Sequence, residues 1–188
     1  NIYRLLRQNP EDRGLIRLWQ SGVRKSNEGV YFYTPFCFFP YVAFPLLNSL
    51  KVAHNCLRFC IPNLRKILRE KDFTNIDLLF IGDIGLISAL KFVKPKMIVL
   101  RISDRISGYK NVPSTVSMLQ KEVINISDLV FATSRSLTQE AGAISPNTLY
   151  LPNGVDEEFI GGIDKGYPYP QEYKNIKNPI AIYIGAIS

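Results

Sequence analysis

Short, fully apolar runs recur along the second half of the chain. The runs at 78–81 and 97–100 contain no polar residue, which is typical of strands buried on both faces of a parallel sheet. The segments 128–133 and 148–151 have the same strand-like character. Each run is followed by Gly, Asp, Ser or Asn residues that favour a turn. The pattern therefore predicts successive strands separated by connecting segments.

The segments between these runs have the periodicity of helices. Residues 84–92 predict one helix, and Pro113 suits the first turn of an amphipathic helix. Ser134 is placed to cap a short helix that ends near Gly142. The face of the amphipathic helix expected to be buried consists of Val112, Val116, Leu119, Val123 and Ile126. The face expected to point away consists of Ser117, Gln120, Lys121 and Asn125.

The alternation of strands and helices predicts an α/β fold. We expect a Rossmann-like parallel sheet with right-handed crossovers and helices on both faces. The polar stretch 161–178 is expected to be a linker after a domain spanning 1–160. Residues 179–188 predict the first strand of a second domain. Because the chain starts at Asn1 rather than Met and stops after this run, we expect both ends to be truncated.

The first part of the chain is aromatic and rich in proline. Residues 30–33 predict a strand, and 31–50 carry no charge but contain three prolines, which disfavours a membrane-spanning helix. This run fits a buried loop, a pocket wall or an interfacial patch. Residues 46–71 predict a helix with a break at Pro62. Its basic residues suit either an anionic lipid surface or an ordinary solvated helix face. They are Lys51, Arg58, Arg65 and Arg69.

The chain carries an excess of positively charged residues. The chain has 23 Lys and Arg against 16 Asp and Glu, a formal net charge of +7. This excess fits an anionic partner or a solubilising surface, and the spread of basic residues along the chain disfavours nucleic acid. Cys37, Cys56 and Cys60 have no zinc spacing, and His54 is the single histidine. We therefore expect reduced thiols, no metal site and a cytoplasmic protein.

Candidate chemistry gathers where the predicted strands end, because ligands bind beyond the carboxyl ends of an open parallel sheet. Asp104 follows one strand between Arg101 and Arg105, and could accept a proton from an attacking hydroxyl group. A structural ion pair or a helix cap is the alternative. Asp83 and Gly85 follow the preceding strand, where Asp83 also suits a helix cap.

Several enzyme classes are disfavoured by motifs that the sequence lacks. There is no G-x-G-x-x-G dinucleotide motif and no P-loop. Ser134 and Ser136 lack the G-x-S-x-G context of a hydrolase nucleophile, and one histidine leaves little room for a Ser-His-Asp triad. We expect no cofactor.

Two segments together resemble GT-B glycosyltransferases. D-L-V-F-A-T-S at 128–134, followed by L-Y-L-P-N-G-V-D at 149–156, is similar to the last strands of the N-terminal domain in that family. The run 182–185 (I-Y-I-G) resembles the strand that opens its nucleotide-sugar domain. The likeness covers roughly 76–188, and the family's glycine-rich first strand is not evident. It implies an acceptor-side domain whose nucleotide-sugar donor is bound by a second domain.

A narrower resemblance rests on R-I-S-D at 101–104 and the basic loop after it. This is similar to bacterial glucuronosyltransferases of the xanthan type and to teichuronic-acid transferases. The likeness implies metal-independent, inverting transfer to a saccharide acceptor, often lipid-linked, at the inner face of the plasma membrane. Asp104 would then be the base. The residues expected to bind the acceptor or shape the cleft are Asp83, Gly85, Arg101, Arg105, Tyr109, Lys110, Ser134, Arg135, Asn153 and Gly154.

Two other functions stay open at this point. A retaining GT-B transferase would need no Asp base, and a non-enzymatic Rossmann-like module would only bind a ligand. In either transferase case we expect the 188 residues to be inactive alone, because the donor-binding domain is absent from them.

Overall fold

The computed structural model describes residues 22–42, 44, 46–105, 112–157, 160–161, 171–173 and 176. The chain forms two compact units, Asn1–Pro152 and Asn153–Ser188. The first contains the sheet, and the second includes the short helix η4 (Gln171–Tyr173). The predicted linker and the strand predicted at 179–188 fall mostly outside the described residues. The division into domains therefore stays a prediction.

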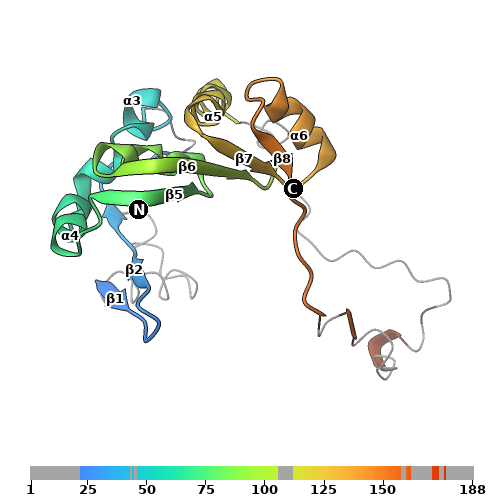
Figure 1. The fold of residues 1–188 in the computed structure, drawn as a ribbon, viewed down its shortest axis with the longest axis horizontal. Coiled ribbons are helices and arrows are strands. Elements are labelled where there is room, and N and C mark those ends of the chain that lie inside the picture. The colour runs from blue at the N-terminus through green and yellow to red at the C-terminus, as the bar shows by residue number, and fades with distance from the viewer. Residues whose placement is uncertain are drawn as a thin grey trace. The chain divides into compact units, whose positions relative to one another are not determined.

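Parallel strands form the central sheet of the first unit, in the order β5-β6-β7-β8 (Figure 1). Leu100 of β6 lies between Ile81 of β5 and Val130 of β7, so the apolar runs seen in the sequence stand side by side. The α/β class and the Rossmann-like parallel sheet are confirmed. The strand bounds are β5 (Asn75–Ile81), β6 (Lys94–Ile102), β7 (Leu129–Ala132) and β8 (Thr148–Tyr150).

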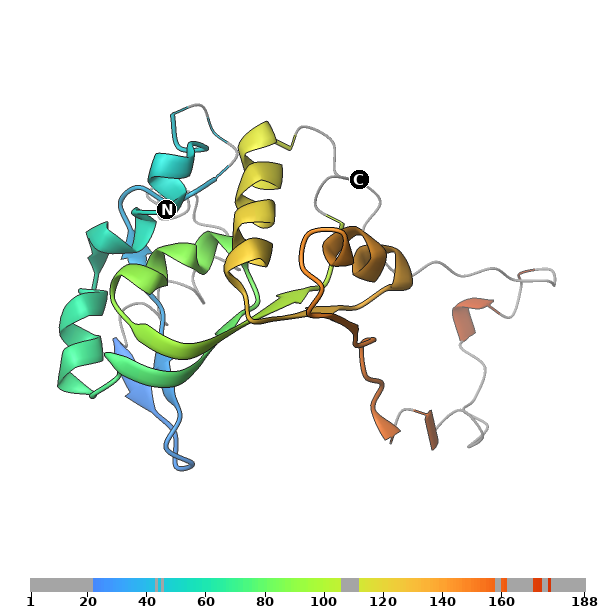
Figure 2. The same ribbon diagram turned by 45° about the horizontal axis from the view of Figure 1, so that its top comes forward.

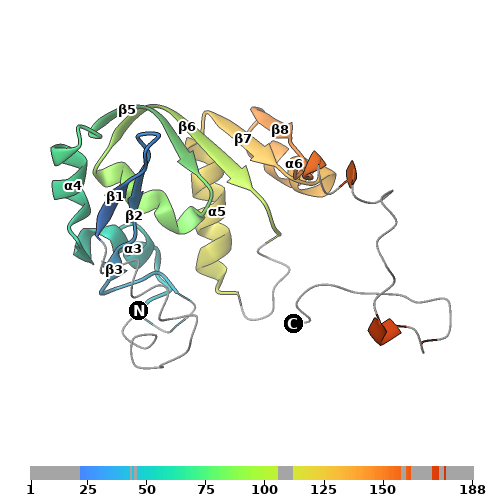
Figure 3. The same cartoon turned by 90° about the horizontal axis from the view of Figure 1, so that it is seen from below.

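Three helical connections join these strands and lie along one face of the sheet (Figures 2 and 3). Strand order equals chain order, so every crossover steps in the same direction. Since crossovers between parallel strands are right-handed, steps in one direction put their helices on one side. The connections are the 3-10 helix η2 (Ile84–Lys91), α5 (Ser114–Ile126) and α6 (Arg135–Gly142).

Strand residues are buried on the face of the sheet that the helices cover and exposed on the other face. Ile81, Leu100 and Val130 face the helices and are almost fully buried in the main core. Leu78, Phe80 and Leu149 alternate with such residues and point to the opposite face, where each is about half exposed. The predicted cover of this second face is not supplied by the described residues.

The buried stripe of α5 differs from the prediction at one end. Leu119 and Val123 are buried as expected, but Ile124 is 3% exposed and Ile126 is 38% exposed. The predicted stripe ran toward Ile126, whereas the observed stripe turns toward α6. Ile124 belongs to the main core, and it also lines a groove there with Ala141 and Ile144.

Residues 46–71 are not one broken helix, which corrects the prediction. The chain pairs Phe36–Cys37 (β3) with Cys60–Ile61 (β4), and this antiparallel pairing interrupts the helical stretch. Side-chain hydrogen bonds cap two of the helices in this stretch. Ser49 Oγ accepts from the Val52 N–H, and Asn63 Oδ1 accepts from the Lys66 N–H. The helices of the stretch are α3 (Leu50–Ala53), η1 (Cys56–Phe59) and α4 (Leu64–Glu70). A hairpin of β1 (Val23–Lys25) and β2 (Tyr31–Tyr33) precedes them.

A second, smaller core contains all three cysteines. Cys56 and Cys60 are buried, Cys37 packs against them, and all are free thiols, as predicted. The Tyr33 hydroxyl donates to the Pro62 carbonyl at 2.6 Å and lies 3.0 Å from Cys60 Sγ. Burial, with smaller effects from Cys60 and Cys56, raises the pKa of Cys37 from 9.0 to about 11.

None of the helices in the described part of the chain has the length and apolar character needed to span a bilayer.

The two isoleucines near the end of α5 give a matched test of its orientation. We expect Ile124→Ala to lower the free energy of unfolding by about 2–5 kcal/mol, because it empties a core position. Ile126→Ala should lower it by less than about 1 kcal/mol, since that side chain is partly in solvent. Urea unfolding measures both values. A larger loss for Ile126→Ala than for Ile124→Ala would show that the stripe follows the original prediction.

The raised pKa of Cys37 predicts sensitivity to alkali. The folded state keeps the Cys37 thiol protonated at a pH where the unfolded chain already ionises it. The stability gained from this raised pKa is complete below about pH 9 and is lost as the pH rises through about 11. We expect the free energy of unfolding to fall across this window, and to fall less in Cys37→Ser, whose hydroxyl does not ionise. Urea unfolding at pH 7, 9 and 11 measures the fall. Parallel curves for the two proteins would contradict the assignment.

Candidate active site

The carboxyl ends of β5 and β6 enclose a cavity of about 250 Å³, which we call the strand-end cavity. Asp83 enters it after β5, and Arg101 and Asp104 enter it at the end of β6. The parallel register explains this meeting, because Ile81 is aligned with Leu100 and both strands end at the same edge. The lining is Gly82, Asp83, Ile84, Leu100, Arg101, Ile102, Ser103, Asp104 and Gln120.

Asp104 is exposed at this cavity, two residues beyond the end of β6. Among the described residues, no side chain or backbone group forms a hydrogen bond or ion pair with its carboxylate. Arg105, expected beside it, instead pairs with Glu140 of α6. Asp104 therefore neither caps a helix nor joins a structural ion pair in the described part of the chain. It is the carboxylate of the cavity best placed to accept a proton.

Asp83 has a structural task at the start of η2. Its Oδ1 accepts a hydrogen bond from the Gly85 backbone N–H at 2.8 Å and caps the helix. A Cβ atom at Gly85 would lie 3.2 Å from that same oxygen, so glycine keeps the cap unobstructed. The two carboxylates thus differ, since one is engaged by the backbone and the other is available.

Thr133 holds the segment that carries Asp104, a role that was not among the sequence predictions. Its Oγ1 donates to the Ser103 carbonyl at 2.7 Å, and its backbone N–H donates to Ile102 at 3.1 Å. The two bonds tie the end of β7 to the residues directly before Asp104. A strand-end threonine is common, and only the aligned ends of β6 and β7 reveal the contact.

Ser134 and Arg135, both predicted cleft residues, stabilise α6 and its surroundings. Ser134 Oγ accepts from the Leu137 N–H at 3.3 Å, which confirms the predicted helix cap. The Arg135 guanidinium lies 5.6 Å from the ring centre of Tyr150 in β8, a cation–π contact. Neither residue lines the strand-end cavity.

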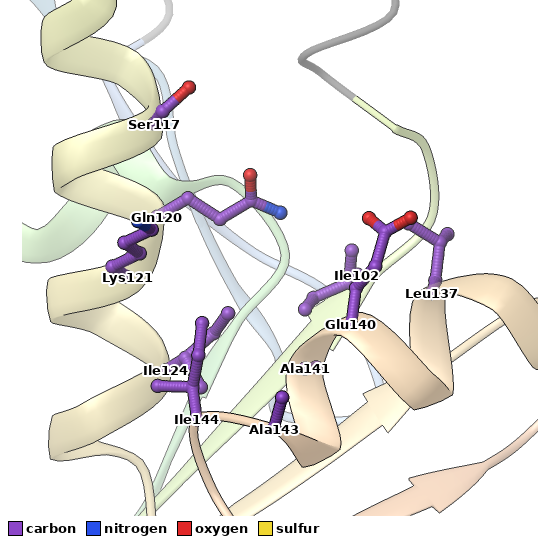
Figure 4. A pocket seen from close by; sticks show the side chains of 10 residues that line it. All are labelled: Ile102, Ser117, Gln120, Lys121, Ile124, Leu137, Glu140, Ala141, Ala143 and Ile144. Atoms are coloured by element: carbon purple, nitrogen blue, oxygen red, sulfur yellow. The ribbon is translucent and has the colours of Figure 1, made fainter.

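A groove of about 420 Å³ between α5 and α6 adjoins this cavity (Figure 4). The two share Ile102 and Gln120, so the groove continues from the strand ends along the helices. Its lining is mainly apolar, with Ile124, Leu137 and Ile144 among the contributors. Ser117, Gln120 and Lys121 also line it, which corrects the prediction that this side of α5 faces solvent alone.

The remaining predicted residues stay predictions. Tyr109 and Lys110 lie outside the described residues. Asn153 and Gly154 belong to the second unit, and their part in a cleft is untested. Among the residues that the structure describes, no group of three or more His, Cys, Asp or Glu side chains could hold a metal ion.

The chain matches no family model, no curated protein and no solved structure.

The structural role of Asp83 and the lack of one for Asp104 predict different effects of substitution on the free energy of unfolding. We expect Asp83→Ala to lower the free energy of unfolding by about 1 kcal/mol, because the Gly85 N–H loses its acceptor. Asp83→Asn keeps an acceptor oxygen and should lose less. Asp104→Ala should change stability by under about 0.5 kcal/mol, since it breaks no described contact. Chemical denaturation separates these cases, and a large loss for Asp104→Ala would assign it a structural role.

Proposed function

We propose that this chain is the acceptor-side half of a GT-B glycosyltransferase. The enzyme would move a sugar from a nucleotide sugar to a saccharide acceptor, with inversion and without a metal ion. The observation that carries the proposal is the available carboxylate of Asp104, at the carboxyl end of a parallel strand beside a cavity. The resemblance of 128–134 and 149–156 to the family supports the same reading.

The proposed step requires one base. The acceptor hydroxyl oxygen attacks the anomeric carbon, the bond from that carbon to the phosphate oxygen breaks, and the nucleoside diphosphate leaves. Asp104 takes the hydroxyl proton as the new bond forms. The hydrogen bond from Thr133 to Ser103 would fix the position of Asp104 relative to the acceptor. A second domain would hold the donor and close over the site.

The groove between α5 and α6 supports an acceptor with an apolar part. It begins at the strand-end cavity, through Ile102 and Gln120, and is lined mainly by apolar side chains. A saccharide at Asp104 could therefore extend a lipid portion along the helices. This arrangement suits a lipid-linked acceptor better than a free sugar, because a sugar alone would leave the apolar lining in water.

Exposed aromatic side chains support a peripheral contact with the inner face of the plasma membrane. Phe38, Phe39 and Phe44 are each more than half exposed, and Phe59 is nearly so. The Arg58 guanidinium lies 5.9 Å from the ring centre of Phe59, which combines a cation with apolar surface. Such a combination suits the boundary between lipid headgroups and acyl chains. We propose a cytoplasmic protein that meets its acceptor there.

The test uses the protein expressed from its whole gene. It is incubated with a panel of nucleotide sugars, EDTA and a bacterial lipid extract, and release of nucleoside diphosphate is followed. We expect release with one donor, unaffected by EDTA, and a loss of about 10²–10⁴-fold in Asp104→Asn, because the base is removed. Asp77→Asn is the control, since it makes the same charge change at a side chain 87% exposed on β5.

Three outcomes would contradict parts of the proposal. Transfer that retains the anomeric configuration and survives Asp104→Asn would indicate a retaining transferase. Loss of release in EDTA would indicate a metal requirement. Absence of release with every donor, together with binding of the lipid extract, would favour a binding module.

A further inference from the structure

A second hollow lies at the opposite edge of the sheet, where β5 and β6 begin. It has a volume of about 340 Å³ and is formed by α4, the end of η2 and the residues at the start of both strands. We call it the basic pocket, because four cationic side chains line it and no carboxylate does. Its polar lining residues are Arg65, Arg69, Lys91, Lys94, Thr74 and Asn75.

The positive charges of this pocket are not balanced by the protein as described. The ion pairs of the described residues use other cations, such as Lys66 with Glu70 and Lys96 with Asp77. Lys91 Nζ donates to the neutral Asn55 Oδ1 at 2.7 Å, which leaves its charge uncompensated. Like charges gathered around one hollow repel one another, so a bound anion would relieve that repulsion.

Helix stability explains only part of this arrangement. Arg69 and Lys91 lie in the last turns of α4 and η2, where cations favour the helix dipole. Arg65 lies in the first turn of α4, where a cation is unfavourable, and it stands four residues before Arg69, a like-charge spacing that also disfavours the helix. Lys94 begins a strand and has no helix to stabilise. An anion in the pocket would account for the positions of Arg65 and Lys94, which helix stability does not.

We propose that the basic pocket binds a phosphate-bearing anion at the amino end of the sheet. Guanidinium groups of Arg65 and Arg69 can each donate two hydrogen bonds to phosphate oxygens, and Lys91 and Lys94 add point charges. Thr74 and Asn75 bring neutral hydrogen-bonding groups to the same lining. The site is separate from Asp104, which lies beyond the opposite ends of the strands. It does not depend on the proposed transferase activity.

Pyrophosphate is the first probe, because it presents phosphate oxygens without an apolar part. The 188-residue chain is titrated with sodium pyrophosphate at constant ionic strength by calorimetry, and its thermal midpoint is recorded. We expect binding and a raised midpoint, since a ligand of the folded state stabilises it. Arg65→Gln with Arg69→Gln should weaken binding by about tenfold or more.

The matched control is Lys66→Gln with Lys71→Gln. It removes the same two charges from α4 and its cap, but neither lysine lines the pocket. We expect pyrophosphate affinity within about twofold of the wild type, since long-range attraction alone is lost. Circular dichroism checks that both double variants keep their helices. The variant Lys94→Gln, outside any helix, repeats the test without altering α4.

A second probe separates a lipid headgroup from a free phosphate compound. Vesicles containing phosphatidylglycerol are compared with phosphatidylcholine vesicles at the same salt concentration. Binding to the anionic vesicles that falls in the Arg65/Arg69 variant, without measurable pyrophosphate binding, would assign the site to lipid headgroups. Pyrophosphate binding without vesicle binding would assign it to a free phosphate. Equal binding by the pocket and control variants, or binding of neither probe, would overturn the proposal.

Discussion

The handedness of the crossovers governs the arrangement of this molecule. The chain passes from β5 to β8 without reversing direction, and each right-handed connection therefore lands on the same face. That constraint stacks η2, α5 and α6 over one layer of Ile81, Leu100 and Val130. The parallel direction of the strands places every strand-to-helix turn at one edge. The approach of Asp83 and Asp104, and the bond from Thr133 to Ser103, follow from that common edge.

Local signals in the sequence were enough to predict the sheet and several of its details. Apolar runs identified the strands, and Ser134 was recognisable as a helix cap because capping depends on residues three positions apart. The meeting of Asp83 and Asp104 could also be predicted, since parallel strands end together. Features that depend on distant partners were missed. Burial of Ile124 depends on the core that the strands and helices build together, and the interruption of 46–71 depends on Cys60 pairing with Cys37.

The two edges of the sheet have opposite chemical character. The carboxyl edge presents the available carboxylate of Asp104 and continues into an apolar groove, which suits a neutral hydroxyl compound with an apolar part. The amino edge gathers cations around the basic pocket and suits an anion. Part of the net charge of +7 is thus concentrated at one end of the first unit. A phosphate-bearing ligand and a hydroxyl-bearing ligand would meet different ends of the same strands.

Strand β5, at one of the two edges of the sheet, carries a charge that bears on self-association. Among the described strands β5 pairs with β6 alone, and its apolar residues Leu78 and Phe80 are half exposed. Such a strand is a template for pairing with another molecule. Asp77 interrupts its apolar sequence and forms an ion pair with Lys96 at 2.7 Å. A charge in an otherwise apolar edge strand disfavours pairing with an identical strand, because the same charge would be brought opposite itself or close to itself.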